Sequence, residues 1–285
     1  MPGHRVDLHL HTTTSDGKLT PEQLVDLLGA TQLEYVSITD HDTTSGLDRV
    51  YAAAKKYPRL KVIPGIEISA DYESSEVHVL AYFIDYKNEA FQKELAKIRD
   101  GRIGRAQKML TKLEEMGMPL DWERVRDIAK GDSVGRPHIA QALIERKYVA
   151  TNQEAFDKYL KRGGPAYVET EKFLPVQAVR FARSVGGLPV IAHPNYIKPG
   201  HLDAMLPELK AEGLAGIDVF YSGFDNEKEN LYKRYADKYN LVPCGGSDYH
   251  GFGHEGEYRP GDWGPPMSTV ERLIALAKPE NVRMA

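Results

Sequence analysis

The chain has 285 residues, of which 41% are hydrophobic and 27% charged, and its formal net charge is −4. This composition excludes disordered and fibrous proteins and allows one large barrel or two small domains. No apolar run approaches the roughly 18 to 20 residues that cross a bilayer, and the first residues lack the regions of a signal peptide. Cys244 is the single cysteine, so no intrachain disulfide forms and we expect a cytoplasmic protein.

The first predicted element is a strand over residues 6–11, in which apolar and polar side chains alternate. Residues two apart in an extended chain share a face, so Asp7, His9 and His11 point away from the apolar side. Two imidazoles that project together are typical of a metal site. A catalytic acid/base pair and chance are the alternatives at this point.

Short apolar strands then alternate with polar loops and amphipathic helices. The first helix is predicted over residues 19–30, because Thr20 and Gln23 form a capping box around Pro21. A second capping box, Ser268 with Glu271, predicts the start of the last helix. Strands that alternate with helices favour parallel pairing, hence an α/β sheet or barrel. Further strands are expected at 35–42, 61–69, 76–84, 188–194, 214–220 and 240–250, and further helices at 46–57, 201–213 and 226–239.

Residues 90–166 interrupt this alternation. They favour helix throughout, with glycine or proline breaks, over 90–117, 121–130, 135–149 and 152–164. We therefore expect a helical insertion at 90–166 that covers the substrate, and a barrel formed by residues 1–89 and 167–285. From Lys97 to Arg162 there are 15 Lys and Arg against 10 Asp and Glu, so the insertion is basic. Such a segment faces either an anionic partner or solvent.

Six of the ten histidines lie in or just after predicted strands, and Asp16, Glu67 and Asp248 occupy similar positions. In a (β/α) barrel the C-terminal ends of the strands meet at one face, where active sites are built. Nine such groups around one cleft would be unfavourable without cations, because the carboxylates repel and both residue types lose hydration. The histidines predicted to bind metal are His9, His11, His41, His78, His193 and His250. Those expected at the surface are His4, His201 and His254.

Nine candidate ligands exceed the three or four that one zinc ion takes, and with a bridging carboxylate they fit two or three divalent ions. Nitrogen and oxygen ligands without sulfur suit manganese, iron or zinc. A single histidine in a strand is more often a core residue, but six at strand ends are not expected by chance. Asp40 and Asp42 are candidates to support His41, and Asp42 is an equal candidate for a helix N-cap.

The motifs DLHLH, SDG, TDHD, GIEIS, VHVL, AHP and GSDYH occur in this order and together resemble the PHP family, the polymerase and histidinol phosphatase domain. The resemblance spans nearly the whole chain and implies a distorted seven-stranded (β/α) barrel with a trinuclear metal centre, for which we favour manganese. Glu67 would bridge two of the ions. The implied ligand sets are His9, His11, Glu67 and Asp248 for the first ion, Glu67, His78 and His193 for the second, and Asp16, His41 and His250 for the third.

The helical insertion and the GRPHIA segment resemble the branch of this family that contains nucleoside 3′,5′-bisphosphate phosphatases and a 5′-to-3′ exoribonuclease. The resemblance implies that Arg136 and His138 hold substrate phosphate. The alternative is that these two residues only decorate a helix that starts at Pro137.

Two departures from the family pattern concern substrate recognition. Residues 163–165 are Gly-Gly-Pro where relatives often have Gly-Lys-Pro, so one lysine contact is missing or is supplied by Lys161 or Arg162. Asn195 and Tyr196 stand where relatives commonly have Gly-Arg. In addition, arginines at 99, 102 and 105 form a basic helical stripe that faces either substrate or water.

These features predict a metal-dependent phosphoesterase that hydrolyses a nucleotide phosphate monoester, either a nucleoside 3′,5′-bisphosphate or the 5′ end of short oligonucleotides. A metal-bound hydroxide is the expected nucleophile, because clustered divalent ions lower the pKa of bound water and offset phosphoryl charge. The general acid is not identified. The negative net charge favours a short substrate, and no membrane or stable protein partner is expected.

Three alternatives stay open at this point. One is a histidinol-phosphate-type phosphatase, which the helical insertion disfavours. Another is amide hydrolysis on a similar barrel, for which no strand end offers a bridging lysine. The third is a non-catalytic metal-binding regulatory module, whose expected signature, missing ligands, is not found.

Overall fold

The computed structural model describes residues 4–73, 75–131, 133–169, 172–253 and 257–282. Within them the chain forms a seven-stranded sheet in which each strand lies beside the next one in the sequence. This order confirms the predicted seven-stranded barrel. The strands are β1 (Val6–Leu10), β2 (Tyr35–Ile38), β3 (Lys61–Tyr72), β4 (Ser75–Tyr82), β5 (Leu188–Ile191), β6 (Gly216–Tyr221) and β7 (Val242–Gly246).

The sheet curves until its two edges meet. The segment after β7 bonds to the first strand, because the Asp248 amide donates to the His9 carbonyl at 2.9 Å and the His11 amide donates to the Tyr249 carbonyl at 3.0 Å. The result is a nearly closed barrel. These bonds place the residues that follow β7 beside the C-terminal end of β1.

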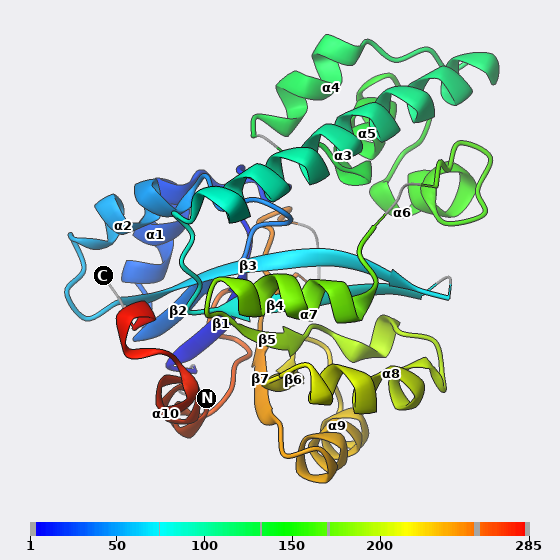
Figure 1. Cartoon of the computed structure of the whole chain (residues 1–285). Helices are drawn as coiled ribbons and strands as arrows, with labels where there is room; N and C mark the ends of the chain where they lie inside the picture. Colours follow the sequence, from blue (N-terminus) through cyan, green and yellow to red (C-terminus); the bar gives the residue numbers. More distant parts are fainter. Residues whose placement is uncertain (1–3, 74, 132, 170–171, 254–256, 283–285) are drawn as a thin grey trace.

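One strand differs from the expected parallel arrangement. Strand β4 runs antiparallel to both β3 and β5, whereas the other neighbouring pairs are parallel. Only two residues separate β3 from β4, and a parallel pair needs a crossover of a dozen residues or more. The two strands therefore form a long hairpin, paired from Gly65 with Tyr82 to Tyr72 with Ser75, which projects beyond the barrel (Figure 1).

Helices cover the outside of the barrel. The capping box that begins α1 is confirmed, since the Gln23 amide donates to Thr20 Oγ1 at 3.3 Å and the Thr20 amide donates to Gln23 Oε1 at 3.0 Å. No described helix combines the length and hydropathy needed to cross a bilayer. The helices of the barrel are α1 (Pro21–Gly29), α2 (Leu47–Ala54), α7 (Pro175–Ser184), α8 (His201–Ala211), α9 (Asn226–Lys238) and α10 (Met267–Leu276).

The capping box predicted for the last helix is wrong. Helix α10 already begins at Met267, so Ser268 lies inside its first turn. The physical reason is the preceding proline, because Pro266 keeps an extended conformation with ψ of 158° and stands at the cap position itself.

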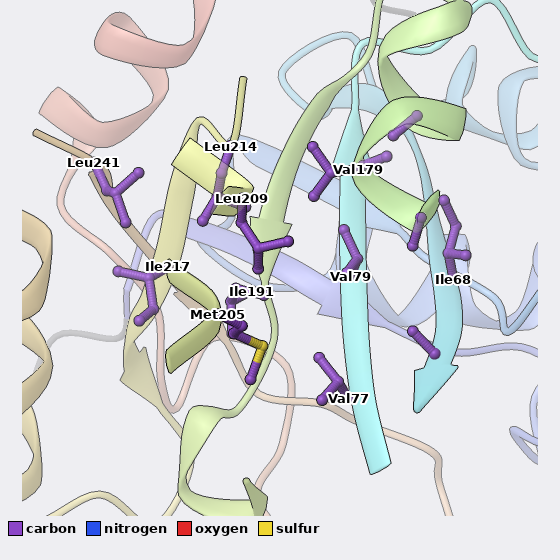
Figure 2. Close-up of a cluster of buried hydrophobic side chains, with 14 of the residues drawn as sticks. Ile68, Val77, Val79, Val179, Ile191, Met205, Leu209, Leu214, Ile217 and Leu241 are labelled. Carbon is purple, nitrogen blue, oxygen red and sulfur yellow. The ribbon is translucent and has the colours of Figure 1, made fainter. Parts of the chain in front are cut away.

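Apolar side chains on the outer face of the sheet pack against α7 and α8 (Figure 2). Val79 of β4 lies beside Val179 of α7 and Val77 lies further along the same strand, while Met205 and Leu209 of α8 lie over β5 and β6. Burial of each such side chain stabilises the fold by about 1.5–3 kcal/mol. This packing holds in place the strands that position the candidate functional residues described below.

Four further helices lie together on one side of the barrel (Figure 1). They are α3 (Glu89–Glu115), α4 (Trp122–Ala129), α5 (Arg136–Glu145) and α6 (Asn152–Ala155), the last continued by a π-helical turn to Leu160. They enclose their own apolar cluster, which runs from Ala106 to Ala166. Helix α3 joins the two bodies, because Phe91 and Leu95 pack in the barrel core and Leu113 packs in the second core.

Candidate metal and phosphate site

The structure brings all nine predicted ligands to one end of the barrel. They come from β1 and the loop after it, from the segments after β2, β5 and β7, and from the middle of β3 and β4. The sequence suggested that Glu67 and His78 lie at strand ends, but both lie within their strands. Strand β3 simply continues past the barrel mouth, and the N-terminal half of β4 reaches the same mouth because this strand runs in the opposite direction.

Glu67 is the centre of the cluster. This carboxylate is fully buried and lies between five imidazoles. Its Oε2 atom is 3.1 Å from His9 Nε2, 3.2 Å from His11 Nε2 and 3.1 Å from His41 Nδ1, and its Oε1 atom is 2.8 Å from His78 Nδ1 and 3.0 Å from His193 Nε2. A parallel bridge between His41 and Glu67 extends the β2–β3 pairing and holds these two residues side by side.

Two more carboxylates flank this centre. Asp248 Oδ1 lies 3.3 Å from His9 Nε2 and 3.1 Å from His11 Nε2. Asp16 lies 3.4 Å from His250 Nε2 and 3.7 Å from His41 Nε2. Each carboxylate therefore faces at least two imidazoles.

Three groups of ligand atoms are compact enough to hold an ion, with all atoms of a group within 4.8 Å of one another. The first matches the ligand set that the family resemblance implied for one ion. The second adds His11 to the implied set around Asp16, and the third has His41 where the resemblance implied His193. The groups are His9, His11, Glu67 and Asp248; His11, Asp16, His41 and His250; and His41, Glu67 and His78.

The electrostatics of the cluster follow from this crowding. Burial alone would raise the pKa of Glu67, but the surrounding imidazoles hold it well below its usual value. Burial would lower the pKa of His250, yet Asp16 raises it to about 10. For His41, burial prevails and lowers the pKa to about 3. The carboxylates are thus ionised, and neighbouring imidazoles compete for positive charge.

The residues present fit divalent cations. Four buried ring nitrogens have no hydrogen-bond partner among the described residues, namely His9 Nδ1, His11 Nδ1, His11 Nε2 and His41 Nδ1. Two of them, His11 Nε2 and His41 Nδ1, lie 3.1 Å from a carboxylate oxygen without the geometry of a hydrogen bond, as expected where both atoms point to a shared ion. An unpaired buried nitrogen is costly, and a neutral imidazole is a common metal ligand.

Asp40 and Asp42 support the site through the backbone, and within the described chain neither bonds to the His41 ring. Asp40 accepts hydrogen bonds from the Thr12 amide at 2.8 Å and from Ser15 Oγ at 2.7 Å, which fixes the loop after β1. Asp42 accepts from the Ser69 amide at 2.8 Å. Helix α2 begins five residues later with Gly46 at its cap position, so the alternative of an N-cap at Asp42 is wrong.

Sequence reasoning missed two supporting residues. Asp218 on β6 is fully buried, and its Oδ2 accepts a hydrogen bond from the His193 amide at 3.0 Å. Tyr221, on the same strand, donates from its hydroxyl to Asp248 Oδ2 at 2.7 Å. The available signal for Asp218 was a single charged residue within the otherwise apolar strand GIDVFY.

Three residues of this region have a positive φ, namely Asp42 at 52°, His193 at 26° and Asp248 at 54°. Residues other than glycine adopt this conformation at a cost of order 1–3 kcal/mol, and such strain gathers at functional sites. Here the three residues lie just after β2, β5 and β7, beside or among the candidate metal ligands.

A cavity of about 950 Å³ opens next to the cluster, between the barrel mouth and α3. Asp16, His41 and His78 form part of one wall. Cations from the helices over residues 90–166 and from the segment before α7 form another, namely Lys97, Arg102, Arg105, Lys108, Arg136 and Lys172. The arrangement places anion-binding groups across from the candidate metal ligands.

The predicted phosphate residues occupy different environments. Arg136 lines the cavity and pairs with Glu76 at 2.7 Å. His138 is only 4% exposed, and its Nδ1 accepts a hydrogen bond from the Gly135 amide at 2.9 Å, which caps α5. Burial lowers the pKa of His138 to about 4, so its ring is neutral.

The residues proposed to replace a missing lysine lie elsewhere. Lys161 pairs with Asp157 at 3.6 Å, and Arg162 pairs with Asp71 at 2.6 Å. Neither is among the described residues that line the cavity, whereas Lys172, which sequence reasoning missed, is one of them.

The histidines expected at the surface differ among themselves. His4 is exposed. His201 is partly buried at the start of α8, where its Nδ1 lies 2.8 Å from Ser75 Oγ. His254 lies outside the described residues.

The model of the PHP domain family matches residues 7–172, more than half of the chain. The chain belongs to the PHP domain family. This confirms the resemblance drawn from the sequence motifs and agrees with the barrel and the clustered ligands.

Several curated proteins are similar to this PHP protein. A 3′,5′-nucleoside bisphosphate phosphatase of Chromobacterium violaceum is 30% identical over 277 residues, which cover 96% of this chain and 94% of that protein. A 5′-3′ exoribonuclease of Haemophilus influenzae is 31% identical, covering 86% and 90%. A phosphoribosyl 1,2-cyclic phosphate 1,2-diphosphodiesterase of Eggerthella lenta is 33% identical, covering 86% and 94%.

Two solved structures share the fold over nearly their whole length. A Chromobacterium violaceum protein described as an amidohydrolase, with bound sulfate and no metal, has a TM-score of 0.86 and 29% identity, covering 96% of this chain and 97% of that one. A Bifidobacterium adolescentis protein described as a candidate metal-dependent phosphoesterase has a TM-score of 0.86 and 30% identity, covering 98% of both chains.

Proposed function

We propose that this PHP protein is a metal-dependent phosphoesterase that hydrolyses a phosphate monoester of a nucleotide. A nucleoside 3′,5′-bisphosphate, or the 5′ end of a short oligonucleotide, is the proposed substrate. The observation that carries the proposal is that candidate metal ligands and cations line the same cavity. Eight of the nine predicted ligands fall into three compact groups, and Asp16, His41 and His78 of these groups form part of the cavity wall together with the cations. Similarity to nucleotide- and RNA-processing enzymes supports the substrate class.

The nine residues of the cluster are the proposed ligands of two or three divalent ions, with manganese favoured over iron or zinc. Such ions would activate water and offset the charge that builds on the phosphoryl group. The protein's own contribution is to hold the ligands rigidly, with Glu67 between ligand groups and Asp218 and Asp40 fixing the backbone. The ligands proposed are His9, His11, Asp16, His41, Glu67, His78, His193, Asp248 and His250.

Arg136 and His138 are the proposed contacts to substrate phosphate, with residues 90–166 as the insertion that covers the substrate. The Arg136 guanidinium lies 5.5 and 5.9 Å from the ring centroids of Phe156 and Tyr167 and pairs with Glu76, so these contacts fix its position in the cavity wall. A bidentate guanidinium suits a phosphate. The cytoplasmic location expected from the single cysteine stays a prediction.

The substrate is tested by turnover. Protein purified with manganese is expected to release inorganic phosphate from adenosine 3′,5′-bisphosphate, and a panel of mono-, bis- and oligonucleotides ranks the alternatives. Release of phosphate from histidinol phosphate alone would replace the nucleotide by a smaller substrate. No release from any phosphoester, with metal bound, would favour the non-catalytic regulatory module instead.

The metal site is tested by metal content. Glu67→Ala is expected to lose at least one bound ion per chain and to lower turnover about 100-fold or more, because metal-site disruption of even supporting residues costs 10–100-fold. Glu115→Ala, at an exposed position at the end of α3, is the matched control. Full metal content in Glu67→Ala would contradict the proposed ligand set.

Arg136 is tested by separating binding from chemistry. Arg136→Ala is expected to raise KM for the nucleotide while metal content stays unchanged, because the side chain contacts substrate rather than ions. Loss of metal in this variant would show that Arg136 supports the cluster and not the phosphate.

A further inference from the structure

A second cavity lies at the opposite end of the barrel from the candidate metal ligands. Its volume is about 460 Å³, and its lining includes Leu188 at the start of β5, Ala215 just before β6 and Val242 at the start of β7. By contrast, His193 and Asp248 of the cluster follow the C-terminal ends of β5 and β7. The length of these strands therefore separates the cavity from the cluster, and the proposed function makes no use of it.

Three cations line this cavity, one each from α7, α8 and α10. Each of them donates to a main-chain carbonyl that lies just before a strand. Arg183 Nη1 donates to Gly187 at 3.2 Å, Lys210 Nζ to Asn240 at 3.0 Å and Arg272 Nη2 to Leu241 at 3.2 Å. These bonds orient the three side chains around one space, but a neutral carbonyl does not cancel their charge.

Within the described part of the chain, no carboxylate balances these cations. No aspartate or glutamate lines the cavity, and none has an oxygen within 4.0 Å of a side-chain nitrogen of Arg183, Lys210 or Arg272. Glu212, which is next to the lining residue Gly213, is already paired with Arg180 at 2.6 Å. Like charges around one space repel, and an anion between them removes this repulsion. The cavity therefore favours an anionic ligand.

The cations are placed so that a ligand can reach them. Arg183 and Arg272 are exposed and Lys210 is half-buried. The Arg183 side chain lies over Gly213, where a Cβ atom would stand 3.2 Å from its Nε, so the glycine leaves room for the guanidinium in the cavity wall. Two guanidinium forks and an ammonium match a phosphate monoester, which carries up to two negative charges and several acceptor oxygens.

The rest of the lining is largely apolar. Leu188, Leu214 and Val242 are buried beneath the cavity, whereas Leu276 at its edge is 55% exposed. A free phosphate ion would leave this apolar surface in water, but the organic part of a larger ligand would cover it. The volume also lies in the range of small-molecule sites. These features favour a phosphate that is carried on an organic molecule.

We propose that this cavity is a binding site for an organic phosphate monoester, separate from the metal cluster. Arg183, Lys210 and Arg272 hold the phosphate oxygens, and the organic part of the ligand covers the apolar lining beside Leu276. The bound molecule contacts the N-terminal ends of β5 and β7, whose other ends position candidate metal ligands. The site does not depend on whether the cluster hydrolyses a phosphoester.

The test uses adenosine 5′-monophosphate, which joins a phosphate monoester to a ring system. It is titrated by calorimetry into chelator-treated full-length protein, so that no turnover occurs. Arg183→Gln and Arg272→Gln are each expected to weaken one binding event about 10- to 100-fold, the range for a lost hydrogen bond to a charged group. The same event should persist in Arg136→Ala, which alters the cavity beside the cluster. Isotherms of both glutamine variants that equal the wild-type isotherm overturn the proposal.

Arg234→Gln is the matched control. It removes one arginine charge from an exposed position on α9 that does not line the cavity, and it should bind the nucleotide as wild type does. A cooperative melting transition in each variant shows that the protein is folded. Weakening by Arg234→Gln equal to that of Arg272→Gln would assign the effect to net charge and overturn the site.

Two further ligands separate the phosphate from the organic part. Inorganic phosphate should bind at this site about tenfold more weakly or worse, because it covers none of the apolar lining, and adenosine should not bind there measurably. Equal affinity for inorganic phosphate and the nucleotide would overturn the role of the organic part. Binding of adenosine that Arg272→Gln leaves unchanged, as tight as that of the nucleotide, would overturn the role of the cations.

Discussion

At the scale of single residues, the site depends on how charged groups are paired below the surface. Glu67 is completely buried, yet it is stabilised because five imidazoles surround it. Asp42, equally buried, is stabilised from outside the barrel by Arg102 of α3. Burial alone would raise the pKa of Asp42, but the Arg102 guanidinium lowers it, so the carboxylate is ionised.

We predict that Arg102→Ala destabilises the protein by about 3–5 kcal/mol, because it leaves the Asp42 carboxylate buried and unpaired. The Asp42→Asn, Arg102→Ala double variant should recover part of this loss, since the buried charge is then removed as well. Denaturant unfolding of the two variants and wild type measures both effects. Additive losses in the double variant would contradict the pairing.

At the scale of elements, α3 links the barrel to the insertion. Its first turns pack in the barrel core and its last turns in the second core, so the helix transmits the position of the insertion to the cavity. The stretch between the two cores contains Gly101 and Gly104, which weaken a helix. A Cβ atom on either glycine would meet no atom of the described residues within 4 Å, so close packing does not require glycine at these two positions.

We predict that Gly104→Ala raises the free energy of unfolding by about 0.5–1 kcal/mol, the difference in helix propensity between the two residues. The new methyl group meets no atom within 4 Å, so no strain opposes this gain. Thermal melting of the full chain measures it. A lower melting temperature would show that α3 is not a regular helix at this position.

The pairing of α1 with α2 predicts a pH effect. The Arg49 guanidinium binds both oxygens of Glu22, at 2.8 and 2.7 Å, and this lowers the pKa of Glu22 to about 2. A lowered carboxylate pKa contributes stability above its unfolded value, and this contribution disappears as the pH falls toward 2. Because both side chains are exposed, Arg49→Ala should cost at most about 1 kcal/mol at pH 7.

Unfolding of wild type and Arg49→Ala at several pH values checks this expectation. The difference between them should shrink as the pH falls from about 4.5, the ordinary range of a glutamate, toward 2. A difference that stays constant with pH would assign it to lost packing of the arginine stem.

At the scale of the whole molecule, the site exists because the barrel closes. His9 of β1 and His11 just after it meet Asp248 and His250, which follow β7, through the bonds between β1 and the segment after β7. Gly246 permits this approach, because a Cβ atom there would lie 2.6 Å from both Asp7 Oδ1 and the His9 amide nitrogen.

We predict that Gly246→Ala destabilises the fold by about 1–3 kcal/mol, as expected for an overpacked interior, and reduces the metal content of the purified protein. Elemental analysis and thermal melting measure the two effects together. Gly104→Ala is the natural control, because the same substitution there meets open space. Unchanged metal content in Gly246→Ala would show that the cluster does not need this closure.

The sequence by itself determined the family, the seven strands and the identity of the clustered side chains. These are local signals: alternating apolar residues mark strands, Thr20 and Gln23 mark a helix start, and histidines beside aspartates mark the strand ends. It did not reveal that β4 is antiparallel, nor that Asp218 and Lys172 belong to the site.

Only the tertiary structure decided which charged groups form ion pairs. Asp42 meets Arg102 across 60 residues of sequence, Glu76 meets Lys172 across 96, and Arg105 meets no described carboxylate. Neighbours along the chain cannot indicate such pairs, because ionic interactions depend on distance and burial in space and these are set by how the insertion packs against the barrel.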